Sequence, residues 1–139
     1  SKPICARISA TDWLADGRGQ TPEQSIEFVR VLRERGLDLI DVSTGGNTPE
    51  SKPITGRRYQ LPFAEQIRHA VDIPVVTVGA VQSVDQANTI LAAGRADLVA
   101  MARPHLVSPS LTLQAAVEYE FPDQYWPNQY LAAKPRPAN

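Results

Sequence analysis

The sequence has one cysteine, few aromatic residues and no long apolar run. The single cysteine, Cys5, excludes an intrachain disulfide framework and is typical of a protein from a reducing cytoplasm. No stretch approaches the roughly 20 apolar residues of a transmembrane helix, so we expect no membrane partner. The net charge is −1 with both signs interspersed, which argues against nucleic-acid binding. These absences leave a globular, cytoplasmic protein as the expectation.

Several motifs of common enzyme classes are also missing. The sequence contains no metal-ligand spacing, no Walker loop, no GxSxG elbow and no GxGxxG fingerprint. The first residues do not form a signal peptide, because no charged segment precedes an apolar one. Strand-like sequence instead starts almost at once, which suggests that the chain was cut from a longer protein.

Four short apolar runs are bounded by Gly, Pro, Ser or Asp. They are Ile4–Ile8, Leu39–Ser43, Val75–Val78 and Leu98–Met101. Near-continuous apolar runs of this length are typical of parallel strands that are buried on both faces. The sequence therefore predicts four strands of a parallel sheet.

Helix signals occupy the segments between these runs. Thr21 is placed to cap a helix, with Pro22 at its first position and Gln24 three residues on. Ser83 and Gln86 form a second capping pair. Further start and stop signals are Gly36, Pro62, Pro74 and Gly94, and two more helices are expected after Pro104 and over about Leu111–Tyr119. Strands that alternate with helices at this spacing predict an α/β fold with right-handed crossovers.

The strand ends carry the best candidates for a ligand site. Arg7, Ser43, Gly79 and Arg103 lie at or just beyond the C-terminal ends of the four runs. An arginine at an apolar strand end needs a partner, because a buried cation is costly alone. That partner is either an anionic ligand, to which a guanidinium offers a planar donor fork, or a carboxylate of the chain such as Asp41 or Asp12. Two such arginines favour the ligand.

Small residues follow the last two strands. Gly79-Ala80 and Ala102-Arg103 allow backbone N–H groups to approach a phosphate closely. In a (β/α)8 barrel the loops after strands seven and eight commonly bind phosphate. The alternative for Gly79 is a plain turn glycine.

Other features are weaker candidates. The 17-residue loop from Thr44 to Gln60 follows a strand, where barrel active sites are built, and loops this long are usually functional or mobile. Its Arg57-Arg58 pair either meets an acidic substrate group or is solvated. Trp13 contacts a substrate or packs, and His105 reaches a ligand or starts a helix. Cys5 is expected to be a small packed residue.

Five segments together resemble the Old Yellow Enzyme-like family of FMN-binding NADH:flavin oxidoreductases. Ile4–Trp13, Gly36–Gly46, Pro74–Val81 and Gly94–Pro104 resemble the fifth to eighth barrel strands with their loops, and Tyr59–Arg68 resembles the helix after the sixth strand. The resemblance covers roughly residues 3 to 113 in the correct order. It implies the C-terminal half of a TIM (β/α)8 barrel, four βα units out of eight.

The resemblance also implies a cofactor and residues that bind it. Family members bind FMN at the C-terminal mouth of the barrel, NADPH or NADH reduces the flavin, and hydride passes to an activated alkene. Arg7 matches the family arginine at the pyrimidine edge of the flavin. Gly79 and Ala80 match the first phosphate-binding loop, while Ala102 and Arg103 match the second, which is usually Gly-Arg.

The expected organisation is a partial barrel over residues 1–120 and a Pro- and aromatic-rich tail over residues 121–139. The tail resembles the reductase half of salicylyl-CoA 5-hydroxylase-like fusions. Because the resemblance places substrate-polarising residues in the missing strands, we expect no enoate reductase activity from the chain alone, weak or absent FMN binding, and a homo-oligomer. Two alternatives are a non-flavin, phosphate-binding half barrel and a non-catalytic α/β interaction module.

Overall fold

A computed structural model of the chain describes residues 2–135. The chain divides into two compact units between Met101 and Ala102. The first contains a four-stranded sheet with three helices, and the second contains three short helical segments. None of the helices within residues 2–135 is long and apolar enough to cross a membrane. The predicted boundary between barrel and tail at residue 120 stays a prediction.

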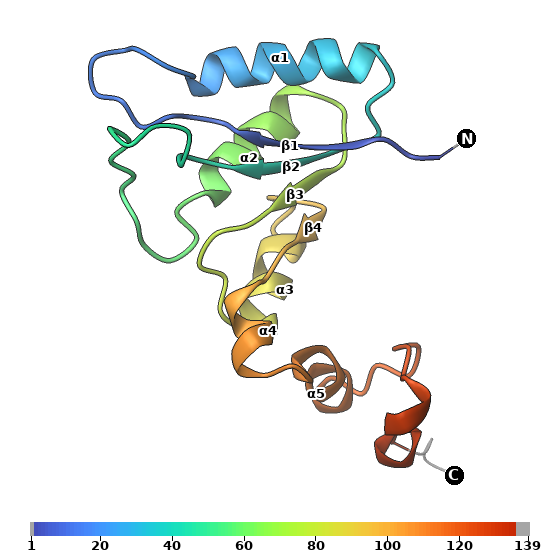
Figure 1. Cartoon of the computed structure of the whole chain (residues 1–139). Helices are drawn as coiled ribbons and strands as arrows, with labels where there is room; N and C mark the ends of the chain where they lie inside the picture. The colour runs from blue at the N-terminus through green and yellow to red at the C-terminus, as the bar shows by residue number, and fades with distance from the viewer. Residues whose placement is uncertain (1, 136–139) are drawn as a thin grey trace. The chain divides into compact units, whose positions relative to one another are not determined.

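The sheet is parallel, and its strands lie side by side in chain order (Figure 1). The strands are β1 (Cys5–Ser9), β2 (Leu39–Ser43), β3 (Val75–Thr77) and β4 (Leu98–Val99). A doubly wound sheet reverses direction at a switch point, whereas a barrel adds each strand beside the last. The order β1-β2-β3-β4 is therefore that of consecutive barrel units.

Only one face of the sheet is fully buried within the first unit. Ile40, Val42 and Val75 are completely covered and pack in one core with Val29 of α1 (Pro22–Glu34) and Ile67 of α2 (Leu61–Ala70). Burying side chains of this size contributes about 1.5–3 kcal/mol each. This core holds the sheet to its helices.

The opposite face of the sheet, here called the open face, carries the alternate strand residues. They are Cys5, Arg7, Leu39, Asp41, Val76 and Leu98. Leu98 is 51% exposed and Cys5 is exposed as well. The apolar runs predicted burial on both faces, but the first unit covers this face only in part. The expectation that Cys5 is packed is wrong, because Cys5 is exposed.

The two predicted helix caps are present. Thr21 Oγ1 accepts a hydrogen bond from the backbone N–H of Gln24 at 3.3 Å, and the Gln24 side chain accepts one from the Thr21 N–H at 3.1 Å. Ser83 caps α3 (Val84–Ala92) through the Gln86 N–H, but the Gln86 side chain bonds the N–H of Gln82, one residue before the cap. Each cap contributes about 1 kcal/mol.

The buried face of α3 and the length of β4 differ from the sequence prediction. The spacing of four from Ala87 predicts that Leu91 lines α3, but the helix buries Ile90, which is 1% exposed, and leaves Leu91 40% exposed. The spacing of three from Ala87 to Ile90 sets the buried stripe here. Strand β4 is two residues shorter than predicted, although the N–H of Ala100 still bonds the Thr77 carbonyl at 2.8 Å.

The second unit begins with two short helices. They are α4 (Arg103–Val107) and α5 (Leu111–Glu118), close to the predicted positions. The tail, predicted as irregular, contains the 3-10 helix η1 (Asn128–Ala133). Trp126, just before it, is 7% exposed, so part of this segment is packed.

Asp97 joins three parts of the first unit. Its carboxylate accepts from the Val75 N–H at 2.9 Å and from the Arg68 guanidinium at 3.1–3.2 Å, and Arg68 also bonds the Gly94 carbonyl at 2.7 Å. The hydrogen bonds from Arg68 hold the pKa of Asp97 below its ordinary value. This carboxylate therefore ties α2, β3 and the α3–β4 turn together in its charged form.

We predict that Asp97→Ala destabilises the first unit by about 1–2 kcal/mol at pH 7, since it removes the acceptor of a backbone N–H and of Arg68. A depressed carboxylate pKa stabilises the fold above the unfolded value near 4, and this contribution is lost as pH falls through the folded value. Urea unfolding at pH 7 and pH 3 measures this contribution. The difference in unfolding free energy between wild type and Asp97→Ala should be smaller at pH 3 than at pH 7. Asp72→Ala serves as a control at an exposed carboxylate. An equal gap at both pH values contradicts the assignment.

Candidate flavin site

The loops after β1 and β2 come together at the C-terminal edge of the sheet (Figure 1). Backbone hydrogen bonds join them: the N–H of Gly45 bonds the Thr11 carbonyl at 2.9 Å, and the N–H of Lys52 bonds the Trp13 carbonyl at 3.4 Å. Parallel strands place such loops at one edge, where α/β proteins build their ligand sites.

Arg7 lies on the open face and is held by two neighbours on β2. Its Nη1 lies 3.2 Å from the Asp41 carboxylate, and its Nε donates to Ser43 Oγ at 3.3 Å. The side chain is still 56% exposed, and Nη2 has no acceptor among residues 2–135. The ion pair with Asp41 that the sequence allowed therefore exists, and it fixes the guanidinium while leaving donors for a ligand.

Asp41 is the less satisfied member of this pair. Its Oδ1 is buried and has no hydrogen-bond partner among the described residues, and the side chain is 22% exposed. A buried carboxylate oxygen without a donor is costly. The register pairs Asp41 with Arg7 on one side and Val76 on the other, so the carboxylate sits within the open face.

Gly79 occupies a turn that only glycine fits well. Its φ is +109°, and a Cβ built there would lie 2.9 Å from Cγ of Gln60. Gln60 is 7% exposed, and its side-chain oxygen accepts from the Thr44 N–H at 3.1 Å. The turn after β3 therefore requires glycine for packing and for backbone conformation, independently of any ligand.

The same turn nevertheless presents free donors. Ala80 has φ +54°, and the backbone N–H groups of Gly79 and Ala80 bond no protein acceptor in the described part of the chain. Neighbouring N–H groups in such turns form anion-binding concavities. The turn thus has the donors that a phosphate needs.

Ala102 and Arg103 belong to the second unit. Ala102 precedes α4, and Arg103 opens it with an exposed side chain that has no ion-pair partner within residues 2–135. His105 lies inside the same short helix. The convergence of Arg7 and Arg103 on one ligand stays a prediction.

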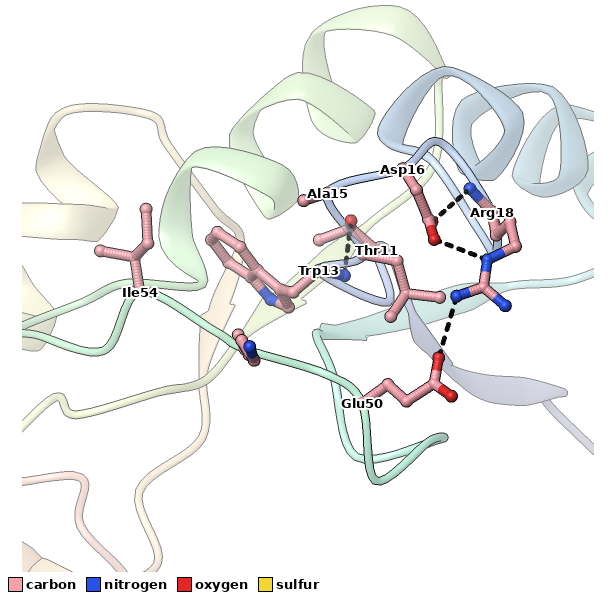
Figure 2. A pocket seen from close by; sticks show the side chains of 9 residues that line it. Thr11, Trp13, Ala15, Asp16, Arg18, Glu50 and Ile54 are labelled. Atoms are coloured by element: carbon pink, nitrogen blue, oxygen red, sulfur yellow. Dashed lines mark hydrogen bonds and ion pairs between the residues drawn. The ribbon is translucent and has the colours of Figure 1, made fainter.

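A hollow of about 600 Å³ lies between the two loops (Figure 2). It is lined by Thr11, Trp13, Leu14, Ala15, Asp16, Arg18, Glu50, Lys52 and Ile54. Trp13 packs edge-on against Phe63, with ring centroids 5.3 Å apart, and its Nε1 is buried without a partner in the described structure. Trp13 therefore packs, as one of its two predicted roles requires, and also forms a wall of the hollow.

Arg18 is a residue of this hollow that the sequence analysis missed. It bonds Asp16 at 2.6 Å and Glu50 at 3.1 Å, and so links the two loops (Figure 2). The hydrogen bonds from Arg18 lower the pKa of Asp16. The Asp-Gly-Arg turn signals the first contact, but Glu50 is 32 residues away, and no local pattern predicts that contact.

The sequence matches the NADH:flavin oxidoreductase / NADH oxidase family over residues 1–123. The chain belongs to this family. The predicted family is therefore confirmed, and so is the fold class, four βα units of the C-terminal half of a (β/α)8 barrel. Membership favours the flavin interpretation over a non-flavin half barrel or an interaction module.

Several curated relatives of this chain are called NADPH dehydrogenase. Those of Geobacillus thermodenitrificans (strain NG80-2) and Listeria monocytogenes serovar 1/2a (strain ATCC BAA-679 / EGD-e) are 40% and 39% identical over 127 residues, which is 88% of this chain. The relative from Clostridium acetobutylicum is 32% identical over 128 residues, 89% of this chain. The chain spans 36–37% of the length of these relatives.

Two solved structures resemble this member of the family. A 2-naphthoyl-CoA reductase in complex with 2-naphthoyl-CoA matches with a TM-score of 0.66 and 27% identity, covering 81% of this chain and 17% of that one. The 6-hydroxypseudooxynicotine amine oxidase of Pseudomonas geniculata N1 matches with a TM-score of 0.60 at 22% identity, covering 85% and 18%, and shows the shared fold.

Gly79→Ala tests the turn after β3. We predict a loss of about 1–3 kcal/mol in unfolding free energy, because the new Cβ is strained at this φ and meets Gln60. Gly46→Ala is the matched control: its φ is +83°, but a Cβ there meets nothing within 4 Å. Urea denaturation should show a smaller loss of unfolding free energy for Gly46→Ala than for Gly79→Ala. Adding Gln60→Ala to Gly79→Ala should give less than the sum of the two single losses, and strict additivity would argue against the contact.

Proposed function

We propose that this chain supplies the C-terminal part of the FMN site of an NAD(P)H-dependent oxidoreductase of the ene-reductase type. The observation that carries the proposal is the Arg7 guanidinium, fixed by Asp41 and Ser43 on the open face with donors to spare. The family match and relatives named NADPH dehydrogenase support the flavin and the nicotinamide donor. When bound, FMN supplies hydride-transfer chemistry to the site.

The proposed cofactor residues fit the groups of FMN. Arg7 would donate to the pyrimidine edge of the ring, where a positive charge favours the reduced form. The free N–H groups of Gly79 and Ala80 would receive phosphate oxygens. Ala102 and Arg103 are the further phosphate-binding residues that the family pattern implies. The role of Asp41 is to hold the guanidinium in place.

The proposed substrate is a small molecule with an activated alkene, or an aryl- or enoyl-CoA-like ester. The likeness to a 2-naphthoyl-CoA reductase supports a CoA ester. NADPH or NADH is the proposed electron donor. Because the chain spans little more than a third of its relatives, we propose that it has no enoate reductase activity by itself. We also propose a cytoplasmic location, which the single cysteine favours.

Titration of the chain with FMN, followed by flavin fluorescence, tests the site. We expect a dissociation constant weaker than about 1 μM, and Arg7→Gln should weaken it about tenfold, since a charged hydrogen bond contributes about 1.5–3 kcal/mol. Arg35→Gln, which changes an exposed arginine beyond the C-terminal end of α1, is the control. Submicromolar affinity would contradict a partial site, and indifference to Arg7→Gln would contradict the assigned arginine.

Self-association follows from the open face and its strand edges. Within the described residues β1 and β4 each have one unpaired edge, and Leu98 and Ile4 are 51% and 59% exposed. Open edges and exposed apolar side chains favour pairing between copies. Size-exclusion chromatography with light scattering should give a dimer or larger species. A dilute monomer of 15.2 kDa would contradict this.

A further inference from the structure

The β2–α2 loop contains three cations that have no acidic partner. Lys52, Arg57 and Arg58 make no ion pair in the part of the chain that the structure describes. Of the other arginines of the first unit, Arg35 at the end of α1 also lacks a side-chain partner among residues 2–135, whereas six find an acceptor: Arg7, Arg18, Arg30, Arg33, Arg68 and Arg95. The loop therefore concentrates unneutralised positive charge at the edge where ligands bind.

Arg58 is held in a backbone conformation that does not favour arginine. Its φ is +59°, and its carbonyl accepts from the Leu61 N–H at 3.0 Å in the turn that starts α2. A non-glycine residue in this region costs on the order of 1 kcal/mol. Glycine would suit the backbone of this turn better. We therefore infer that an arginine stands at position 58 because of its guanidinium group.

Lys52 joins this charge to the hollow between the loops. Its N–H bonds the Trp13 carbonyl, and it lines the hollow. The apolar side chains of Trp13 and Ile54 line the same hollow (Figure 2). The acidic residues of the hollow, Asp16 and Glu50, both bond Arg18. Lys52 thus stands beside an apolar wall, Arg57 and Arg58 follow it in the same loop, and the carboxylates that line the hollow are already engaged.

We propose that residues 52–58, with the hollow beside them, bind the phosphorylated adenosine end of a nucleotide ligand. Guanidinium groups match phosphate oxygens through paired hydrogen bonds, and the apolar wall suits a flat base. Two ligands of the proposed function carry this chemistry, NADPH through its 2′-phosphate and a CoA ester through its 3′-phosphate. The identity of the ligand rests on the proposed function. Recognition of an adenosine that carries a second phosphate can be tested independently of that function.

Calorimetric titration of the chain with three nucleotides tests the inference. We expect adenosine 2′,5′-bisphosphate or adenosine 3′,5′-bisphosphate to bind at least about tenfold more tightly than 5′-AMP. The double variant Arg57→Ala/Arg58→Gly should lose this preference, and glycine at 58 relieves backbone strain, so the fold is kept. Arg35→Ala, an exposed arginine beyond the end of α1, should retain the preference. Tighter binding of the 2′ isomer assigns NADPH, and of the 3′ isomer a CoA ester.

Equal binding of AMP and both bisphosphates would overturn the inference, as would an equal loss in the double variant and in Arg35→Ala. Circular dichroism and urea unfolding of each variant exclude a loss of fold as the cause. FMN titration of the same variants separates this inference from the proposed function. The affinity for FMN should be unchanged in Arg57→Ala/Arg58→Gly. A weaker affinity for FMN is expected only in Arg7→Gln.

Discussion

The register between β1 and β2 is the constraint on which the site depends. It places Arg7 directly beside Asp41 and Ser9 beside Ser43, all on the face opposite the helices. A shift of one residue would turn the guanidinium into the apolar core, where an unpaired cation is strongly unfavourable. The burial of Ile40 and Val42 under the helices fixes the register, so hydrophobic packing on one face determines the position of the cation on the other.

A second connection links the loops to the sheet. Gln60 accepts a hydrogen bond from the Thr44 N–H and packs against Gly79, so it connects both ends of the long loop to the turn after β3. The N–H groups at Gly79 and Ala80, which bond nothing among residues 2–135, belong to a turn that is packed from one side. The turn glycine and the phosphate cradle are therefore compatible interpretations of the same residue.

Local features of the fold were predictable from sequence, because short-range chemistry decides them. Thr21 with Gln24 and Ser83 with Gln86 cap helices where the spacing predicts, and the strand starts follow from apolar runs. Contacts between residues that are far apart in the sequence were not predictable. Arg18 contacts Glu50 because the loops after β1 and β2 lie next to each other in the fold.

The candidate site shows the same division. Arg7 was recognisable as an arginine that needs a partner, but sequence alone left an ion pair and a ligand as alternatives. The register supplies Asp41, and the geometry leaves donors free, so the ion pair does not exclude a ligand. The burial of one sheet face alone was missed, because apolar runs report on strand character and not on which face finds a cover within this chain.

The most direct test of the central claim is an NMR titration that follows arginine side-chain and backbone N–H resonances as FMN is added. The account predicts that the Arg7 Nε–H and the amides of Gly79 and Ala80 shift together with one binding curve, while Arg35 does not move. Saturating FMN that leaves the Arg7 resonance unchanged would contradict it.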